Sequence, residues 1–133
     1  MSDLCPCGSG STLDSCCGAL IRGDREAATA EQLMRSRYTA FATGDEAYLM
    51  RSWHPSTRPA EITLDADTRW LHLAVTETRD GGPFHRDGTV SFVAVYRDGA
   101  GRGELREHSR FVREGRWFYV DGDVSETEAE EIS

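Results

Sequence analysis

The chain has 133 residues and a formal net charge of −8, and it contains no lysine. An acidic protein repels phosphate backbones, so we expect no general nucleic-acid binding, and without lysine there is no Schiff base, lysine general base or Walker-type phosphate lysine. The length suffices for one core. Because no signal-peptide pattern or membrane-length apolar run is present, we expect a soluble, cytoplasmic protein without a membrane partner.

The first 25 residues have few large apolar side chains and cannot bury enough surface to fold unaided. This segment holds all four cysteines: Cys5, Cys7, Cys16 and Cys17. Their spacing lets four thiolates reach one tetrahedral ion, and Gly8 and Gly10 give the chain freedom to turn. Two disulfides or four inert thiols are the alternatives, but a reducing compartment favours metal. A closed four-sulfur site indicates a structural Zn²⁺ rather than a catalytic one.

Four thiolates around one Zn²⁺ leave a net negative charge, so the sulfurs need hydrogen-bond donors. We expect these donors from the amides of residues 8–10 and from Arg22 or Arg25. Since zinc would be the main source of stability for this segment, we expect it to be stabilised separately from the rest of the chain.

Helical signals follow the cysteines. Thr29 and Gln32 form a capping-box pattern, and apolar side chains then recur at helical spacing until Gly44. Asp45 is placed to cap a second short helix, which Pro55 should stop because proline disfavours helical geometry in the residue before it.

From Thr68 onward the apolar period changes to two, which predicts strands. The expected strand segments are 71–75, 90–96, 105–112 and 116–120. Because segment 90–96 is apolar on both faces, we expect it to be central and covered on both sides. Helices followed by an antiparallel meander predict an α+β domain in which helices pack on one face of a curved sheet.

Two motifs resemble known families. The string CPCGSG followed by the cysteine pair resembles the SEC-C motif, the zinc hook at the carboxyl end of the translocation ATPase SecA. The strings LMRSRYTAF (33–41), WHPS (53–56) and SRFVREGRWFYVDG (109–122) resemble the YchJ family of uncharacterised bacterial proteins. That resemblance implies a nuclear transport factor 2-like (NTF2-like) domain, a cone of curved sheet wrapped by helices.

Together these patterns divide the chain into three parts. We expect a SEC-C-type zinc hook over residues 1–25, an NTF2-like α+β domain over 26–122 and an acidic tail over 123–133. The acidic stretch from Asp121 onward has almost no apolar side chains, which is typical of a solvated segment.

A carboxylate and a hydroxyl between large apolar neighbours on one strand indicate either the polar patch of a pocket or a strand at the edge of the sheet. The candidate pocket residues are Arg35, Tyr38, Trp53, His54, Glu107, Ser109 and Arg110. Glu107 and Ser109 share a strand face with large apolar neighbours, so the carboxylate needs a cation. Arg35 and Arg37 diverge by about 200° on a helix, so at most one faces inward. We nominate Arg35 as the partner of Glu107, in either a structural ion pair or a ligand site.

Two further candidates depend on local geometry. If residues 114–115 form a two-residue turn, Arg110 faces Tyr119 in an arginine–aromatic pair. His54 lies at the end of the second helix, where it could act as a general base or stabilise the helix dipole.

The leading functional hypothesis is a zinc-binding adaptor or ligand-binding protein. The hook would dock on a protein partner, of chaperone or ribosome type by its resemblance to the SecA hook, and the sheet would supply a ligand pocket or a homodimer face. The alternative is a small enzyme acting on an apolar molecule in the cone, with one acid or histidine as proton carrier. A pocket containing Glu107, His54 and an arginine would favour the enzyme, whereas a filled cone would favour the adaptor.

Overall fold

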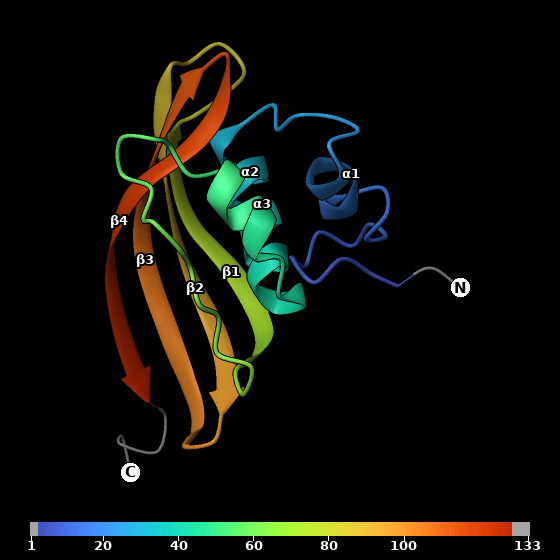
Figure 1. Cartoon of the computed structure of the whole chain (residues 1–133), viewed down its shortest axis with the longest axis vertical. Coiled ribbons are helices and arrows are strands. Elements are labelled where there is room, and N and C mark those ends of the chain that lie inside the picture. Colours follow the sequence, from blue (N-terminus) through green and yellow to red (C-terminus); the bar gives the residue numbers. More distant parts are fainter. Residues whose placement is uncertain (1–2, 129–133) are drawn as a thin grey trace.

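The computed structural model describes residues 3–128, which form three helices and one four-stranded sheet (Figure 1). The elements are α1 (Cys17–Arg22), α2 (Ala30–Thr43), α3 (Glu46–Arg51), β1 (Arg69–Asp80), β2 (Asp87–Asp98), β3 (Gly101–Glu114) and β4 (Arg116–Glu128). The strands pair antiparallel in sequence order, β1-β2-β3-β4. This arrangement confirms the predicted α+β fold. Within residues 3–128, none of the helices is long and apolar enough to cross a membrane.

The predicted capping residues are found at the starts of α2 and α3. Oγ1 of Thr29 accepts a hydrogen bond from the amide of Gln32 at 3.1 Å, and α2 ends at Gly44 in the left-handed region, with φ 78°. Oδ1 of Asp45 accepts from the amide of Tyr48 and so caps α3. This helix already ends at Arg51, before Pro55 can stop it.

Helix α2 lies against the concave face of the sheet, and α3 follows it on the same side (Figure 1). The core combines apolar side chains of α2, including Leu33 and Met34, with Val90, Phe111 and Trp117 of the sheet. The indole Nε1 of Trp117 also donates to the carbonyl of Ala28. These contacts fix the start of α2 over the sheet.

The cysteine segment belongs to this same core. Cys5, Cys7 and Cys17 are buried in the cluster that contains Leu33 and Leu73. The expectation that the hook and the sheet domain are stabilised separately is therefore not supported, because the cysteines share one buried cluster with residues of α2 and of β1.

In β1 the observed burial departs from the predicted alternation of buried and exposed side chains. Leu73 is 6% exposed as predicted, but Leu71 is 47% exposed. The register shifts between Trp70 and His72, so Leu71 is the extra residue of a bulge and points outward. The bulge directs Trp70 towards α2, where it contacts the rings of Tyr38 and Phe41.

β2 is central, because it pairs with both β1 and β3. The helices cover one of its faces, and no helix among residues 3–128 lies on the other face (Figure 1). Val93 and Val95 alternate with the pocket residues Phe92 and Ala94 and so belong to that other face. The prediction of cover on both sides is therefore confirmed for one side only. The homodimer through the sheet stays a prediction.

The β3–β4 hairpin corrects two expectations. The turn centres on Gly115, with φ 77°, and Glu114 pairs with Arg116. After a bulge at Arg110, this residue pairs with Asp121 and not with Tyr119. The guanidinium of Arg110 donates from Nε to Asp121 Oδ1 at 2.5 Å and from Nη1 to Asp123 Oδ2 at 3.1 Å, so it lies outside the predicted pocket.

The acidic segment is a strand and not a solvated tail as far as Glu128. β4 pairs with β3 as far as Gly103, and the hydroxyl of Tyr96 donates to Oε2 of Glu126 at 2.8 Å. Cross-strand arginine and tyrosine donors offset the acidic charges that made this stretch look solvated in the sequence. Residues 129–133 of the predicted tail lie outside the described residues.

Candidate functional site

The four cysteines come together as a potential metal site. Their Sγ atoms all lie within 4.8 Å of one another, and all four are free of disulfides. Cys7 and Cys16 have Sγ atoms 3.7 Å apart, and those of Cys16 and Cys17 are 4.0 Å apart. Tetrahedral coordination with zinc–sulfur bonds of roughly 2.3 Å places ligand sulfurs about 3.8 Å apart. The donor set and its spacing therefore fit a closed, tetrahedral metal site.

A tight hairpin and α1 position these ligands. The amide of Cys5 donates to the carbonyl of Ser11 at 2.8 Å, and Gly8 turns the chain with φ 82°. Gly18 sits so close to the carbonyl of Leu13 that a Cβ there would lie 2.6 Å from the oxygen. Glycine at this position lets α1 begin at Cys17, the second cysteine of the pair. We call residues 3–22 the metal module.

The sulfurs receive donors from two hydroxyls. Oγ1 of Thr39 on α2 lies 3.6 Å from Sγ of Cys5, and Oγ of Ser9 lies 3.2 Å from Sγ of Cys16. Hydrogen bonds from Cys17 and from the side chain and amide of Ser9 lower the pKa of the Cys7 thiol to about 4. The expected amide donor of the turn is thus present at Ser9.

The predicted arginine donors do not contact the sulfurs. Arg22 binds the carboxylates of Asp14 and Asp24, and Arg25 donates to the carbonyl of Ser15. Both arginines serve the backbone and acids around α1. Hydroxyl groups take their place, that of the buried Thr39 at Cys5 and that of the exposed Ser9 at Cys16.

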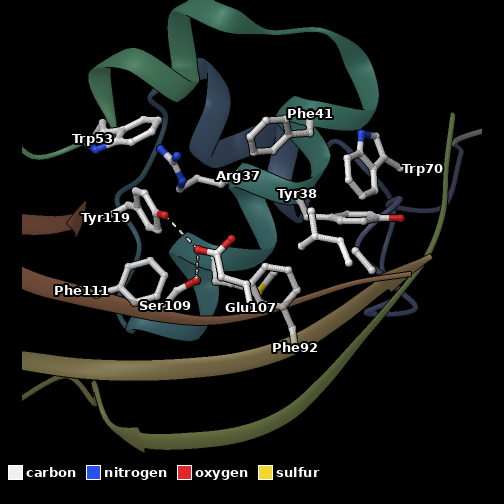
Figure 2. Close-up of a pocket in the computed structure, with 13 residues that line it drawn as sticks. Arg37, Tyr38, Phe41, Trp53, Trp70, Phe92, Glu107, Ser109, Phe111 and Tyr119 are labelled. Carbon is white, nitrogen blue, oxygen red and sulfur yellow. Dashed lines mark hydrogen bonds between the residues drawn. The ribbon is translucent and has the colours of Figure 1, made fainter. Parts of the chain in front are cut away.

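On the other side of α2 lies a cavity of about 260 Å³ between the helix and the concave sheet face, which we call the cone pocket (Figure 2). Its lining residues are Met34, Arg37, Tyr38, Phe41, Trp53, Trp70, Phe92, Ala94, Leu105, Glu107, Ser109, Phe111 and Tyr119. They come from α2, from all four strands and from Trp53, which follows the C-cap residue of α3. Most are aromatic or aliphatic, so the few polar groups stand in an apolar enclosure.

Glu107 is at the centre of the polar groups. Its Oε2 accepts a hydrogen bond from Ser109 Oγ at 2.6 Å and another from the Tyr119 hydroxyl at 2.9 Å. Burial and the neighbouring Glu107 carboxylate raise the pKa of Tyr119 well above its usual value. The tyrosine therefore stays a hydrogen-bond donor at neutral pH.

Arg37 supplies the cation of this cluster. Its side chain is buried, and Nη1 donates to the carbonyl of Leu49 at 2.9 Å and to Oγ of Ser52 at 2.6 Å. The guanidinium stacks over the rings of Tyr119 and Trp53, at 4.3 and 5.1 Å from their centroids. Burial lowers its pKa to about 10, so the group is still charged at neutral pH.

The nomination of Arg35 as the partner of Glu107 is wrong. Arg35 points to the metal module, where Nε donates to Glu31 Oε2 at 2.9 Å and Nη1 donates to the carbonyl of Cys7 at 2.7 Å. One inward arginine was expected, and the helix turns Arg37 inward instead. Sequence spacing contained this signal, since Met34, Arg37, Tyr38 and Phe41 follow the i, i+3, i+4, i+7 pattern of one helix face.

The other candidates divide between the pocket and the surface. Tyr38, Trp53, Glu107 and Ser109 line the cone pocket. His54 does not, because its ring binds Ser56 at 2.7 Å and Glu114 at 3.0 Å. Trp70 also lines the pocket but was not predicted to, because the bulge in β1 that turns it inward cannot be recognised from the apolar alternation.

Comparisons with known proteins agree with this architecture. A family model described as the YchJ, middle NTF2-like domain matches residues 29–122, and the SEC-C motif matches residues 1–19. A UPF0225 protein of Streptomyces coelicolor is 51% identical over 90% of this chain and 94% of its own length. A UPF0225 protein of Cupriavidus pinatubonensis is 46% identical over 90% of this chain and 87% of its own.

Solved structures show the same fold. The solution structure of a SEC-C motif-containing protein from Rhodopseudomonas palustris has a TM-score of 0.77 and 36% identity, covering 90% of this chain and 96% of that one. The crystal structure of a SEC-C motif-containing protein from Psychrobacter arcticus has a TM-score of 0.73 and 26% identity, covering 91% and 82%. The chain therefore belongs to the YchJ (UPF0225) family, with a SEC-C motif preceding an NTF2-like domain.

Proposed function

We propose that this protein binds a small, largely apolar molecule in the cone pocket and that its metal module holds a structural Zn²⁺. The observation that carries the proposal is an open cavity that is mainly aromatic yet contains the buried guanidinium of Arg37 and the half-buried carboxylate of Glu107. We expect a cavity formed by imperfect packing to be lined by apolar groups alone, because burying a charge costs free energy unless another group compensates it.

The size of the pocket limits the ligand. An apolar cavity of roughly 150 Å³ holds benzene, and pockets for drug-sized ligands begin at about 300 Å³. At about 260 Å³ the cone pocket lies between these values. A molecule of one or two rings matches this space, and the flat faces of Phe41, Trp70 and Phe92 would stack against it.

Zinc in the metal module would help to hold α2, the helix that contributes to the pocket lining. The four thiolates would leave no open coordination position, so the ion would be structural. Thr39 and Arg35 of α2 contact the module at Cys5 and Cys7, while other residues of α2 line the pocket. Holding this helix in place is the role that the contacts support.

The enzymatic alternative has one observation in its favour. Among the residues lining the pocket, Glu107 is the one carboxylate, and it could accept a proton from a bound molecule. His54, the other predicted proton carrier, is turned away to Glu114. For the adaptor hypothesis the argument remains the resemblance of the SEC-C motif, and an open pocket favours ligand binding over it.

The proposal is tested by titrating ¹⁵N-labelled, metal-loaded protein with naphthalene and following the indole N–H signals by NMR. We expect the signals of Trp53 and Trp70 to shift and saturate, whereas Trp117, which does not line the cavity, serves as internal reference. Leu105→Trp, which fills the pocket, should abolish the shifts, and Leu71→Trp on the exposed bulge should leave them unchanged. Unchanged Trp53 and Trp70 signals at saturating naphthalene would refute the proposal.

A further inference from the structure

Two opposite charges face the cone pocket without meeting each other. Within residues 3–128, neither Arg37 nor Glu107 has a salt-bridge partner within 4.0 Å. The side chain of Arg37 contributes to the lining and the whole residue is only 6% exposed. Burial lowers the pKa of the Arg37 guanidinium, and the neighbouring Tyr119 hydroxyl and Glu107 carboxylate act against this lowering.

Both groups keep hydrogen-bonding capacity after their contacts with the protein are counted. Arg37 uses Nη1 for Leu49 and Ser52, so Nε and Nη2 retain N–H donors. Glu107 uses Oε2 for both Ser109 and Tyr119, so Oε1 retains its lone pairs. In Figure 2 this second carboxylate oxygen points up into the pocket, towards the helix and away from Ser109.

A direct ion pair would have satisfied both charges at lower cost, because buried opposite charges compensate each other best in contact. Instead, Tyr119 and Ser109 hold the carboxylate on one side, and Trp53 and Tyr119 hold the guanidinium in a stack. The fold thus fixes a donor and an acceptor apart from each other on the wall of an aromatic cavity. This is the arrangement of a preorganised polar subsite.

We propose that the cone pocket selects a neutral ring compound bearing a hydroxyl group, which donates its hydrogen to Oε1 of Glu107 and accepts a hydrogen bond from Arg37. This inference rests on the proposed function and adds the polar chemistry of the ligand. An anion would be repelled by Glu107 and a cation by Arg37, and the two charges together sum to zero. A hydroxyl is the smallest single group that is both donor and acceptor.

The test compares five probes of one ring system on the metal-loaded protein, by the same NMR titration. They are 2-naphthol, 2-methoxynaphthalene, naphthalene, 2-naphthoate and 2-naphthylmethylammonium. A hydrogen bond to a charged partner strengthens binding by about tenfold or more. We expect 2-naphthol to bind at least about tenfold more tightly than naphthalene or 2-methoxynaphthalene, which lacks the donor, and more tightly than either ion.

A pair of variants on β3 assigns the effect to one side chain. Glu107→Gln keeps the shape but removes the charge, so it should reduce the preference for 2-naphthol over naphthalene to within about threefold. Glu104→Gln, on the opposite face of the same strand, should keep the full preference. If Glu107→Gln does not fold, the five-probe series on the unmodified protein still decides.

The outcomes separate this inference from the function on which it rests. Equal affinity for naphthalene and 2-naphthol would overturn the hydroxyl subsite and leave apolar ligand binding standing. Tighter binding of the carboxylate or the ammonium probe would overturn the subsite in favour of a charged ligand. Binding of none of the five would refute the pocket's function and the inference together.

Discussion

The metal module and the cone pocket contact different residues of α2 and are built in opposite ways. The module takes its four ligands from one short stretch, Cys5 to Cys17. The pocket takes its lining from α2, Trp53 and all four strands. A motif that is local in sequence is readable as a string, whereas a cavity depends on registers and bulges that no single segment determines.

The two regions nevertheless share one core. Cys7 is 0% exposed and belongs to the same buried cluster as Met34, which also lines the pocket. A change in the metal module should therefore destabilise the sheet as well. Whether a change in the cone pocket affects the module depends on how rigid α2 is.

The largest effect is expected from Cys7→Ser. This change removes one of the four candidate metal ligands from a fully buried position, and without the proposed ion the other thiolates would lack a compensating cation. We expect the whole chain to melt in one transition at a temperature lower by about 10 °C or more, since loss of a structural metal costs on the order of several kcal/mol. Circular dichroism in the far ultraviolet and tryptophan signals in the near ultraviolet measure this.

The control for this variant is Ser11→Ala, at an exposed position of the same hairpin, which should melt like the unmodified protein. Chelator treatment of the unmodified protein should reproduce the Cys7→Ser result. Sheet tryptophans that melt at an unchanged temperature in Cys7→Ser would show that the module is independent of the core after all.

A smaller effect is expected on the pocket side from Arg37→Met. Without the guanidinium, the buried carbonyl of Leu49 and the hydroxyl of Ser52 lose a charged hydrogen-bond donor, which should cost about 2–3 kcal/mol. The double variant with Glu107→Gln should cost less than the sum of the two single changes, because it leaves no uncompensated charge. Urea unfolding of the four proteins measures the coupling.

Arg106→Met is the matched control, because Arg106 is exposed on β3 and forms a surface ion pair with Glu104. Its loss should change the free energy of unfolding far less. Strict additivity of Arg37→Met and Glu107→Gln would mean that the two charges do not influence each other across the cavity.

Much of the fold was accessible from the sequence because its signals are local. The cap at Thr29, the stop at Gly44 and the change of period at Thr68 act within a few residues, and all three match the structure. The predictions failed where a residue on another strand determines the local structure. Arg110 lies across from Asp121, and this pairing converts an acidic segment into part of β4.

The same distinction applies to the candidate sites. The cysteines follow a motif, so all four were found together. Glu107 and Ser109 were placed in the pocket by strand alternation alone. Arg37 was missed in favour of Arg35, although both lie on α2, because the choice depends on which face of the helix meets the module and which meets the sheet.

The smallest effect on stability is expected from Arg35→Met. This variant tests most directly whether the metal module and the cone pocket are coupled. The ion pair with Glu31 is partly exposed and contributes little, so the main loss is the hydrogen bond from Nη1 to the carbonyl of Cys7. Methionine keeps the apolar stem, and we expect a cost of about 1–2 kcal/mol. Amide exchange should accelerate at residues 5–9, while the naphthalene shifts of Trp53 and Trp70 stay as in the unmodified protein. Arg35→Lys, which keeps a charged donor, should recover part of the protection. If Arg35→Met instead weakens naphthalene binding, α2 transmits changes from the metal module to the cone pocket, and the two regions act as one site rather than as neighbours on a shared helix.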